Sequence, residues 1–417
     1  MPYVPPRHPK SDRVQTGVHF RPGETPPDLW RLIVLDVVPG AAASDVADAL
    51  GEIWQLLTEL SQGRVRELGP YGDGSAGAFV PDGSLAFVLG YGARLFGPRA
   101  GGAPLIDAAA RPGALPAHYP AGNMAPFPAL HWRDDAAAGR AQRDIAVQLT
   151  ADTELALARA VLDIAELIRT ASLPLRLRAM FDGFGRDDRR SWIGFHDAIN
   201  TLSAADRREA IIIERNAASG WTEGGTYMVF LRVVVDIGRW RDLDVPAQEA
   251  VVGRTKLHGV PLAGIDRTRD GRIETTPDLA CPFRTTGPDG RRDPEACREP
   301  DFAHDPRLAA SHVGRASPHW SRARIYRQGY EFLEVGTDGR PVVGLNFVAF
   351  VKSPDEVHRL LAEKDGFGDC NFGGGVDGIP SPPLLSLSAA GVYVAPAIPD
   401  EGERFPGECL FMTETVA

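Results

Sequence analysis

The chain has 417 residues, enough for two packed domains or one duplicated unit with a large core. Its net charge of −10 excludes a typical nucleic-acid-binding protein, whose phosphate contacts need clustered lysine and arginine. The sequence contains no apolar run long enough to span a membrane and no signal-peptide core near its start. We therefore expect a cytoplasmic protein with neither membrane nor nucleic-acid partners.

The cysteine pattern argues against a zinc ribbon or a thioredoxin-like site, because no CxxC pair is present. Cys281 and Cys297 bracket a polar loop and are far enough apart to pair. Whether they do is left open. The four cysteines are Cys281, Cys297, Cys370 and Cys409.

The first half begins with residues 1–26, which are rich in proline and polar residues and are expected to form an arm over the surface. The β-rich run Leu29–Val38 follows, then a helical apolar pattern with Ser44 as its expected N-cap. Leu85–Leu89 is a second predicted strand. A long glycine- and proline-rich loop then leads to a third strand, Asp144–Thr150, and a helix capped by Thr153.

The second half repeats this order. Gly225–Ile237 is predicted as a long strand, and the sequence Asp244-Val245-Pro246 opens a helix, with proline near its first turn. A second irregular insertion covers about residues 266–306. Val342–Phe350 is a further strand, and Ser353-Pro354 begins a short helix.

The element order favours an α+β fold made of two ferredoxin-like units, each a four-stranded antiparallel sheet with helices. We place an N-terminal arm at residues 1–26, an N-terminal unit at residues 27–182 and a C-terminal unit at residues 183–417. No sequence similarity between the halves is visible, so the duplication is inferred from element order alone.

Four side chains in the second half suggest a haem site. His312 follows a run of small residues, Arg315 comes three residues later, and Arg327 follows His312 by 15 residues. Asp197 lies in the upstream loop GFHDAIN. A peroxidase needs one neutral imidazole on iron, together with a base and a cation where peroxide is deprotonated and cleaved. Taken singly, each residue has an ordinary explanation: a capping or core histidine, a solvated strand arginine, or an Asx-turn aspartate.

These segments, in this order, resemble the dye-decolourising peroxidase family. The matching stretches are SHVGR and RIYRQG around His312 and Arg327, the GxxD part of a GxxDG motif, and the strand GLNFVAF at Gly344–Phe350. The resemblance extends over roughly residues 26–415 and implies haem b as the cofactor, bound mainly by the C-terminal unit.

The resemblance also implies roles for individual residues. His312 would be the iron ligand, Asp197 the distal base and Arg327 the distal cation, while Arg315 would pair with a haem propionate. The second ring nitrogen of His312 would donate to a carboxylate or carbonyl, with Asp355, Glu356 and Asp369 as candidates. The remaining expected haem contacts are Gly194, Phe195, His196, Leu345 and Phe347.

The chain departs from the family pattern at several positions. Ala198 replaces the second glycine of GxxDG, which puts the placement of the Asp197 carboxylate in doubt. Ser317, His319 and Gln328 also differ from common residues of the family. We expect these three changes to reshape the propionate edge or the access channel.

Three functions are compatible with this pattern. The first is a peroxidase that uses hydrogen peroxide to oxidise bulky aromatic or phenolic reductants. The second is a haem-dependent tailoring enzyme acting on one metabolite, suggested by His196 and Ala198 in the altered loop. The third is a non-catalytic haem-binding protein. The sequence leaves a homo-oligomeric assembly open.

Overall fold

The structure is a computed structural model, and its strands and helices alternate in two similar halves. It describes residues 13–68, 79–98, 104–116, 131–132, 140–186, 190–195, 202, 204–214, 220–257, 259, 262, 266–267, 273–274, 310–316, 324–363, 367 and 384–412. Within these residues no helix is long and apolar enough to cross a membrane.

The N-terminal half contains four antiparallel strands and two long helices. The helices α1 (Ala43–Leu60) and α2 (Glu154–Thr170) alternate with the strands. The spatial order of the strands is β2-β4-β1-β5, as in a ferredoxin-like βαββαβ unit. The four strands are β1 (Leu29–Val37), β2 (Ala86–Gly92), β4 (Ile145–Ala151) and β5 (Leu175–Phe184).

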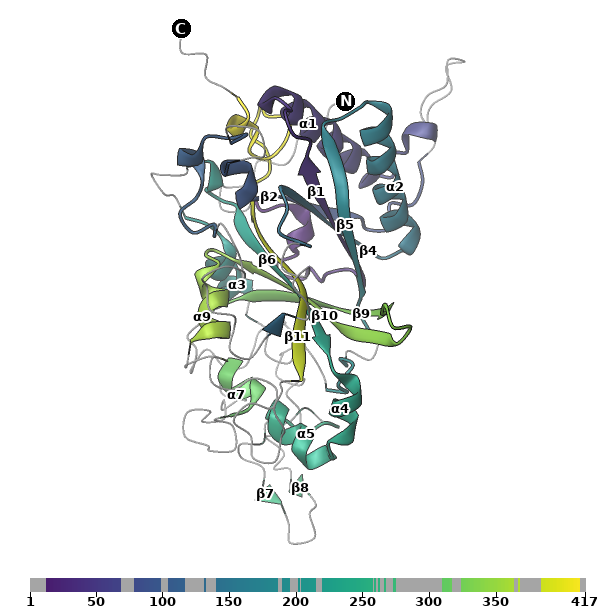
Figure 1. Cartoon of the computed structure of the whole chain (residues 1–417), viewed down its shortest axis with the longest axis vertical. Helices are drawn as coiled ribbons and strands as arrows, with labels where there is room; N and C mark the ends of the chain where they lie inside the picture. Colours follow the sequence, from purple (N-terminus) through teal and green to yellow (C-terminus); the bar gives the residue numbers. More distant parts are fainter. Residues whose placement is uncertain are drawn as a thin grey trace.

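The C-terminal half repeats this strand order as β9-β10-β6-β11. Its strands are β6 (Thr226–Val235), β9 (Tyr326–Val335), β10 (Pro341–Val351) and β11 (Leu385–Ala395). Its helices are α4 (Ile237–Asp242), α5 (Val245–Val252), α7 (His312–Ala316) and α9 (Asp355–Ala362), which lie at the opposite end of the molecule from α1 and α2 (Figure 1). The smaller elements are α3 (Ala204–Ile211), β3 (His131–Trp132) beside β11, and a two-stranded pair of β7 (Asp266–Arg267) and β8 (Ile273–Glu274).

The two sets of strands join into one closed eight-stranded sheet. One junction is the pairing of Phe184 in β5 with Glu331 in β9. The other joins β11 to β2 through Tyr393 opposite Gly92 and Val394 opposite Tyr91. The expected α+β class is confirmed, whereas the expectation of two separate sheets is corrected. Edge pairing satisfies backbone groups that two isolated sheets would leave open.

The inside of the closed sheet is a densely packed apolar core. In a strand alternate side chains point to opposite faces, so every strand contributes one set of residues to this interior. Trp30 stacks there between Phe230 and Tyr330, with ring centroids 5.7 Å and 5.6 Å away. One member from each strand is Trp30, Val88, Ala146, Phe181, Phe230, Tyr330, Phe350 and Tyr393.

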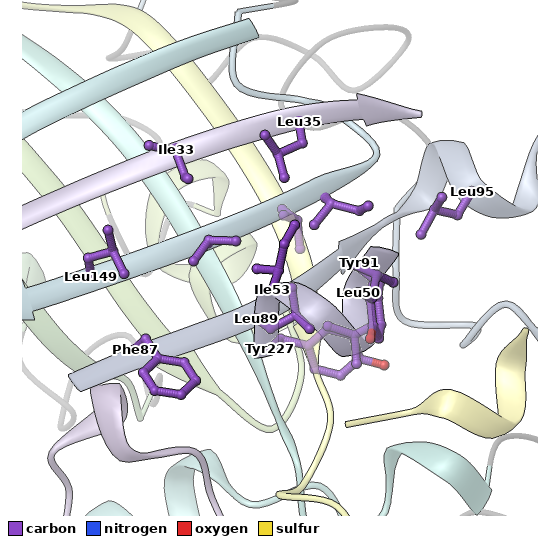
Figure 2. Packing of buried hydrophobic residues seen from close by; sticks show 14 of the residues in the cluster. Ile33, Leu35, Leu50, Ile53, Phe87, Leu89, Tyr91, Leu95, Leu149 and Tyr227 are labelled. Carbon is purple, nitrogen blue, oxygen red and sulfur yellow. The ribbon is translucent and has the colours of Figure 1, made fainter. Parts of the chain in front are cut away.

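The outer face of the sheet carries a second core beneath the helices. Figure 2 shows Leu50 and Ile53 of α1 beside Leu89 of β2 and Leu35 of β1. The helix α2 begins where its sequence predicts, because the Thr153 hydroxyl accepts a hydrogen bond from the Ala156 amide at 3.3 Å.

The expected surface arm is wrong for residues 13–20, which are buried against the closed sheet. Val14, Val18 and Phe20 belong to the interior core. Gln15 replaces a strand partner for Leu89, accepting from its amide at 2.7 Å and donating to its carbonyl at 2.9 Å. Polar residues in this segment thus satisfy buried backbone groups, which allows the segment to enter the core.

Gln328 provides a further correction. Its amide donates to the Val18 carbonyl at 2.6 Å, and only 3% of the residue is exposed. It therefore faces the interior of the sheet and holds the N-terminal segment. The expected role of Gln328 at a propionate edge is not supported, while Ser317 and His319 lie outside the described residues.

His19, at the end of this segment, makes the stability of the fold sensitive to acid. Burial lowers the pKa of His19 below 6.5, although Glu24 and Asp152 oppose the shift. The unfolded chain therefore binds a proton near pH 6.5 that the folded chain does not, and stability falls as the pH drops through this range. We expect His19→Asn to weaken this fall, because asparagine tolerates the left-handed backbone (φ 50°) at this position.

Urea unfolding of wild type and variant at pH 7.5 and 5.5 measures this effect. The two proteins should differ more in stability at one pH than at the other, with the variant losing less on acidification. Equal losses would show that His19 titrates alike in both states.

Several elements differ from the prediction in detail. The helix α1 has Ala42 as its N-cap, so Ser44 lies within its first turn. The strand β5 and the short helices α3 and α4 were not predicted. β5 carries exposed charged residues along most of its length, so it lacks the apolar run that marks a buried strand.

Candidate functional site

His312 is the first residue of the short helix α7. The buried Ser311 hydroxyl accepts a hydrogen bond from the Gly314 amide at 3.1 Å, which caps the helix. The half-buried imidazole stacks on Phe367 with a centroid distance of 4.8 Å and an interplanar angle of 10°. Arg315 lies in the last turn of the same helix. The local sequence thus presents the imidazole from a fixed turn against a flat ring.

The loop of residues 190–195 leads directly to the candidate base. Gly194 has a positive φ of 87°, and Phe195 is buried with its ring edge-on to Trp240. Glycine suits this backbone conformation because it lacks a Cβ. His196, Asp197 and Ala198 lie outside the described residues.

One apolar cluster connects this loop to the histidine helix. Phe195 and Trp240 share it with Val251 and Val252 of α5, and Val313 of α7 packs against it. The helices α5 and α7 are in contact. The segments holding the predicted ligand and the predicted base are therefore neighbours, although more than 100 residues separate them in the chain.

Arg327 lies on the outer face of the sheet, where it pairs with Ala349 of β10. Its neighbours Tyr326 and Gln328 point to the interior, so alternation directs Arg327 toward the outer side. Leu345 and Phe347 share this face of β10 and are half-buried, whereas Val348 and Phe350 on the opposite face are fully buried. A cation and two apolar side chains thus share one face of the sheet.

Arg254, just after α5, is a second cation close to this face. Only 7% of the residue is exposed, and its guanidinium donates to the Gly259 carbonyl at 2.9 Å. Burial, with a smaller contribution from the positive charge of Arg327, lowers the pKa of Arg254 to about 10. Two positive charges that perturb each other at a partly desolvated face favour the binding of an anion.

Comparisons with known proteins identify the family. The family model described as "Dyp-type peroxidase, C-terminal" matches residues 188–371. A dye-decolorizing peroxidase of Thermobifida fusca (strain YX) is 33% identical over 155 residues, a match that covers 36% of this chain and 31% of that protein. A deferrochelatase of Escherichia coli (strain K12) is 25% identical over 350 residues, covering 76% of this chain and 70% of the relative.

Solved structures agree with the sequence matches. A DyP-type peroxidase from Streptomyces coelicolor superposes with a TM-score of 0.67 at 22% identity, covering 97% of this chain and all of that one. A DypB variant from Rhodococcus jostii RHA1 in complex with heme gives a TM-score of 0.54 at 16% identity, with 89% and 94% covered.

The chain belongs to the Dyp-type peroxidase family. This is a family of haem peroxidases, so the expected enzyme class and the expected haem cofactor are confirmed at the level of the family. The matched curated peroxidase is spanned over about a third of its length, and substrates and partners are treated separately below.

The residues of this Dyp-type peroxidase fit a haem. His312 offers an imidazole on a turn of small residues, where a flat macrocycle can approach the backbone. Leu345 and Phe347 offer an apolar wall, and Arg315 a cation suited to a carboxylate. This set of one neutral nitrogen donor, apolar side chains and cations matches the chemical parts of the cofactor.

The partner of the second ring nitrogen of His312 remains a prediction. Asp355 and Glu356 stand in the first turn of α9, and Glu356 accepts hydrogen bonds from the Arg324 amide and from Arg359. Asp369, like Cys281, Cys297 and Cys370, lies outside the described residues.

Sequence reasoning overlooked two cations in this region. Arg254 lies in the Gly-Arg stretch that follows α5, and Arg190 lies at the start of the loop before Gly194. An arginine directly after an apolar helix was the available signal for Arg254. The sequence held no comparable signal for Arg190, whose partners are backbone carbonyls brought close by folding.

Gly194→Ala should strain the loop that leads to Asp197. A Cβ at this position would lie 2.7 Å from the Lys256 Cε atom, in a backbone conformation that costs an L-residue about 1–2 kcal/mol. We expect urea unfolding to show a loss of stability of about this size. The control is Gly113→Ala, where no atom lies within 4 Å of an added Cβ. Equal losses in both variants would contradict the expectation.

Proposed function

We propose that this chain is a haem b peroxidase of the dye-decolourising type, which uses hydrogen peroxide to oxidise bulky aromatic or phenolic reductants in one-electron steps. The shared packing of Phe195 and Val313 carries the proposal, because it makes the base loop a neighbour of the histidine helix. We further propose that the haem is held mainly by residues after 183, since His312, Arg327 and Leu345 all lie in this half.

Each residue has a distinct task in this proposal. Haem, when bound, supplies the iron at which peroxide reacts. His312 holds the iron through its ring nitrogen, and Arg315 pairs with a carboxylate of the cofactor. Asp197 takes a proton from one peroxide oxygen and returns it to the leaving oxygen. Arg327 stabilises the negative charge that develops there, and the neighbouring Arg254 adds to the local positive potential.

Leu345 and Phe347 contribute by excluding water from the reacting face. A dry face strengthens the electrostatic interaction between Arg327 and developing charge, because a low dielectric screens it less. The rigid fork of arginine also explains why lysine would be a poor replacement at this position.

The proposal is tested by absorption spectra of the purified chain, recorded before and after addition of peroxide. We expect a Soret band on haem loading, a rapid spectral change with peroxide and turnover of a bulky dye. A haem-loaded protein that does not react with peroxide would support a non-catalytic haem-binding protein. Loss of iron from the porphyrin should be followed in the same spectra, because several relatives are named deferrochelatase.

The second candidate is a tailoring enzyme acting on a specific metabolite. The observation that favours it is Ala198 in place of a glycine next to the predicted base. If the altered loop restricts the substrate range, Ala198→Gly should raise turnover of generic dyes. Unchanged dye turnover in this variant would show that position 198 does not restrict the reaction.

A further inference from the structure

The loop that precedes the predicted base is held by its carbonyl groups. Three consecutive carbonyls, those of residues 193–195, each accept a hydrogen bond from a fixed donor. The Trp240 indole donates to Ile193 at 3.0 Å, and Arg190 donates to Gly194 at 2.8 Å. The third bond runs from the Ser191 amide to the Phe195 carbonyl at 2.9 Å. Donors from three places therefore fix the backbone immediately before His196 and Asp197.

Arg190 also connects this loop to a second segment. Its guanidinium donates to the carbonyls of Lys256 at 2.7 Å and of Leu257 at 2.8 Å. A planar guanidinium holds such acceptors in one fixed arrangement, which a single ammonium group cannot do. One side chain thus ties residue 194 to residues 256 and 257.

The second segment is itself anchored to α5 and lies close to Arg327. The Lys256 amide donates to Glu249 at 2.9 Å, and its ammonium group donates to Gln248 at 2.5 Å. Arg254, two residues before Lys256, is close enough to Arg327 to have its pKa lowered by that charge. Arg190 therefore connects the base loop to the backbone that also carries the neighbour of the distal cation.

We propose that Arg190 is a positioning residue that fixes where the Asp197 carboxylate stands relative to Arg327. This inference rests on the proposed function, in which Asp197 is the base. Only three residues separate Asp197 from Gly194, so a fixed Gly194 confines the Asp197 Cα to within roughly 11 Å of it. Since Ala198 replaces a glycine of the family pattern, the loop depends on the held backbone before it for its geometry.

The first test uses the haem-free protein. Arg190→Gln removes the guanidinium fork, and we expect hydrogen exchange at the Ser191 and Gly194 amides to become at least roughly tenfold faster. Arg190→Lys keeps the charge and should restore part of the protection. The control is Arg169→Gln, which removes an exposed ion pair with Glu166 on α2, far from the loop.

The second test uses the haem-loaded protein. In Arg190→Gln, peroxide should change the Soret spectrum roughly 10–100-fold more slowly, and the acid limb of the pH–rate profile should shift. Haem content should stay normal, because the His312 helix is unchanged. A loss of folding alone would not move the pH profile of the remaining active protein. Arg169→Gln should retain both the rate and the profile.

The outcomes separate the inference from the function on which it rests. A slow Asp197→Asn combined with a normal rate and pH profile in Arg190→Gln would overturn the positioning role. Unchanged amide exchange in Arg190→Gln would overturn it as well. Normal peroxide rates in both variants would reject Asp197 as the base, and the positioning role would fall with it.

Discussion

His312→Ala is expected to remove the protein's hold on haem iron. The imidazole on α7 is the predicted axial ligand, and alanine offers no donor atom. Changes to groups that only support a metal ligand typically weaken binding about 10–100-fold, so loss of the ligand itself should cost at least that much. Titration of the purified chain with haem, followed at the Soret band, measures the change.

Added imidazole provides a sharp control for this prediction. If alanine at position 312 only removes the ligand, free imidazole should restore the Soret spectrum of the variant. His19→Asn is the matched control, because it replaces a buried histidine among the interior residues and should leave haem binding intact. A normal spectrum and normal affinity in His312→Ala would mean that another group binds the iron.

Asp197→Asn is expected to have the largest effect on the peroxide step. Asparagine keeps the size of the side chain but cannot accept and return a proton in the same way. Removal of a general acid–base group typically slows the reaction by about 10²–10⁴-fold. Stopped-flow mixing with peroxide, monitored at the Soret band, measures the rate, and haem content should remain normal.

A comparison with Arg327→Gln separates proton transfer from charge stabilisation. Loss of the cation should slow the reaction by about 10²–10³-fold, the range seen when one charge-stabilising donor is removed. The rate in Asp197→Asn should also lose the pH dependence that the carboxylate imposes. An Asp197→Asn variant that reacts at the normal rate would rule out this residue as the base.

Local patterns predicted much of the fold because they report burial and chain ends. The strand at Leu29–Val38 and the helix after Thr153 formed close to their predicted bounds, since apolar periodicity and capping act within a few residues. The β5 strand escaped prediction because its exposed charges hide the alternating pattern. Closure of the sheet escaped it too, because the junctions at Phe184 and Gly92 join residues distant in sequence.

The candidate site divides in the same way. His312, Arg327 and Gly194 could be named from sequence because the chemistry of peroxide cleavage demands an imidazole, a cation and a flexible turn before a base. The Arg190 contacts could not be named, since backbone carbonyls carry no residue identity. Gln328 was misplaced for a related reason: a polar side chain on a strand points inward only where the fold provides a buried carbonyl to satisfy it.

The amino-acid sequence by itself determined the α+β class, most strands and helices, and the residue types suited to a haem. Only the tertiary structure decided that the sheet closes, that residues 13–20 enter its interior, and that Arg190 and Arg254 lie near the site. The physical reason is range. Propensity and periodicity act between near neighbours in the chain, whereas edge pairing, burial and charge–charge interaction depend on which distant segments meet.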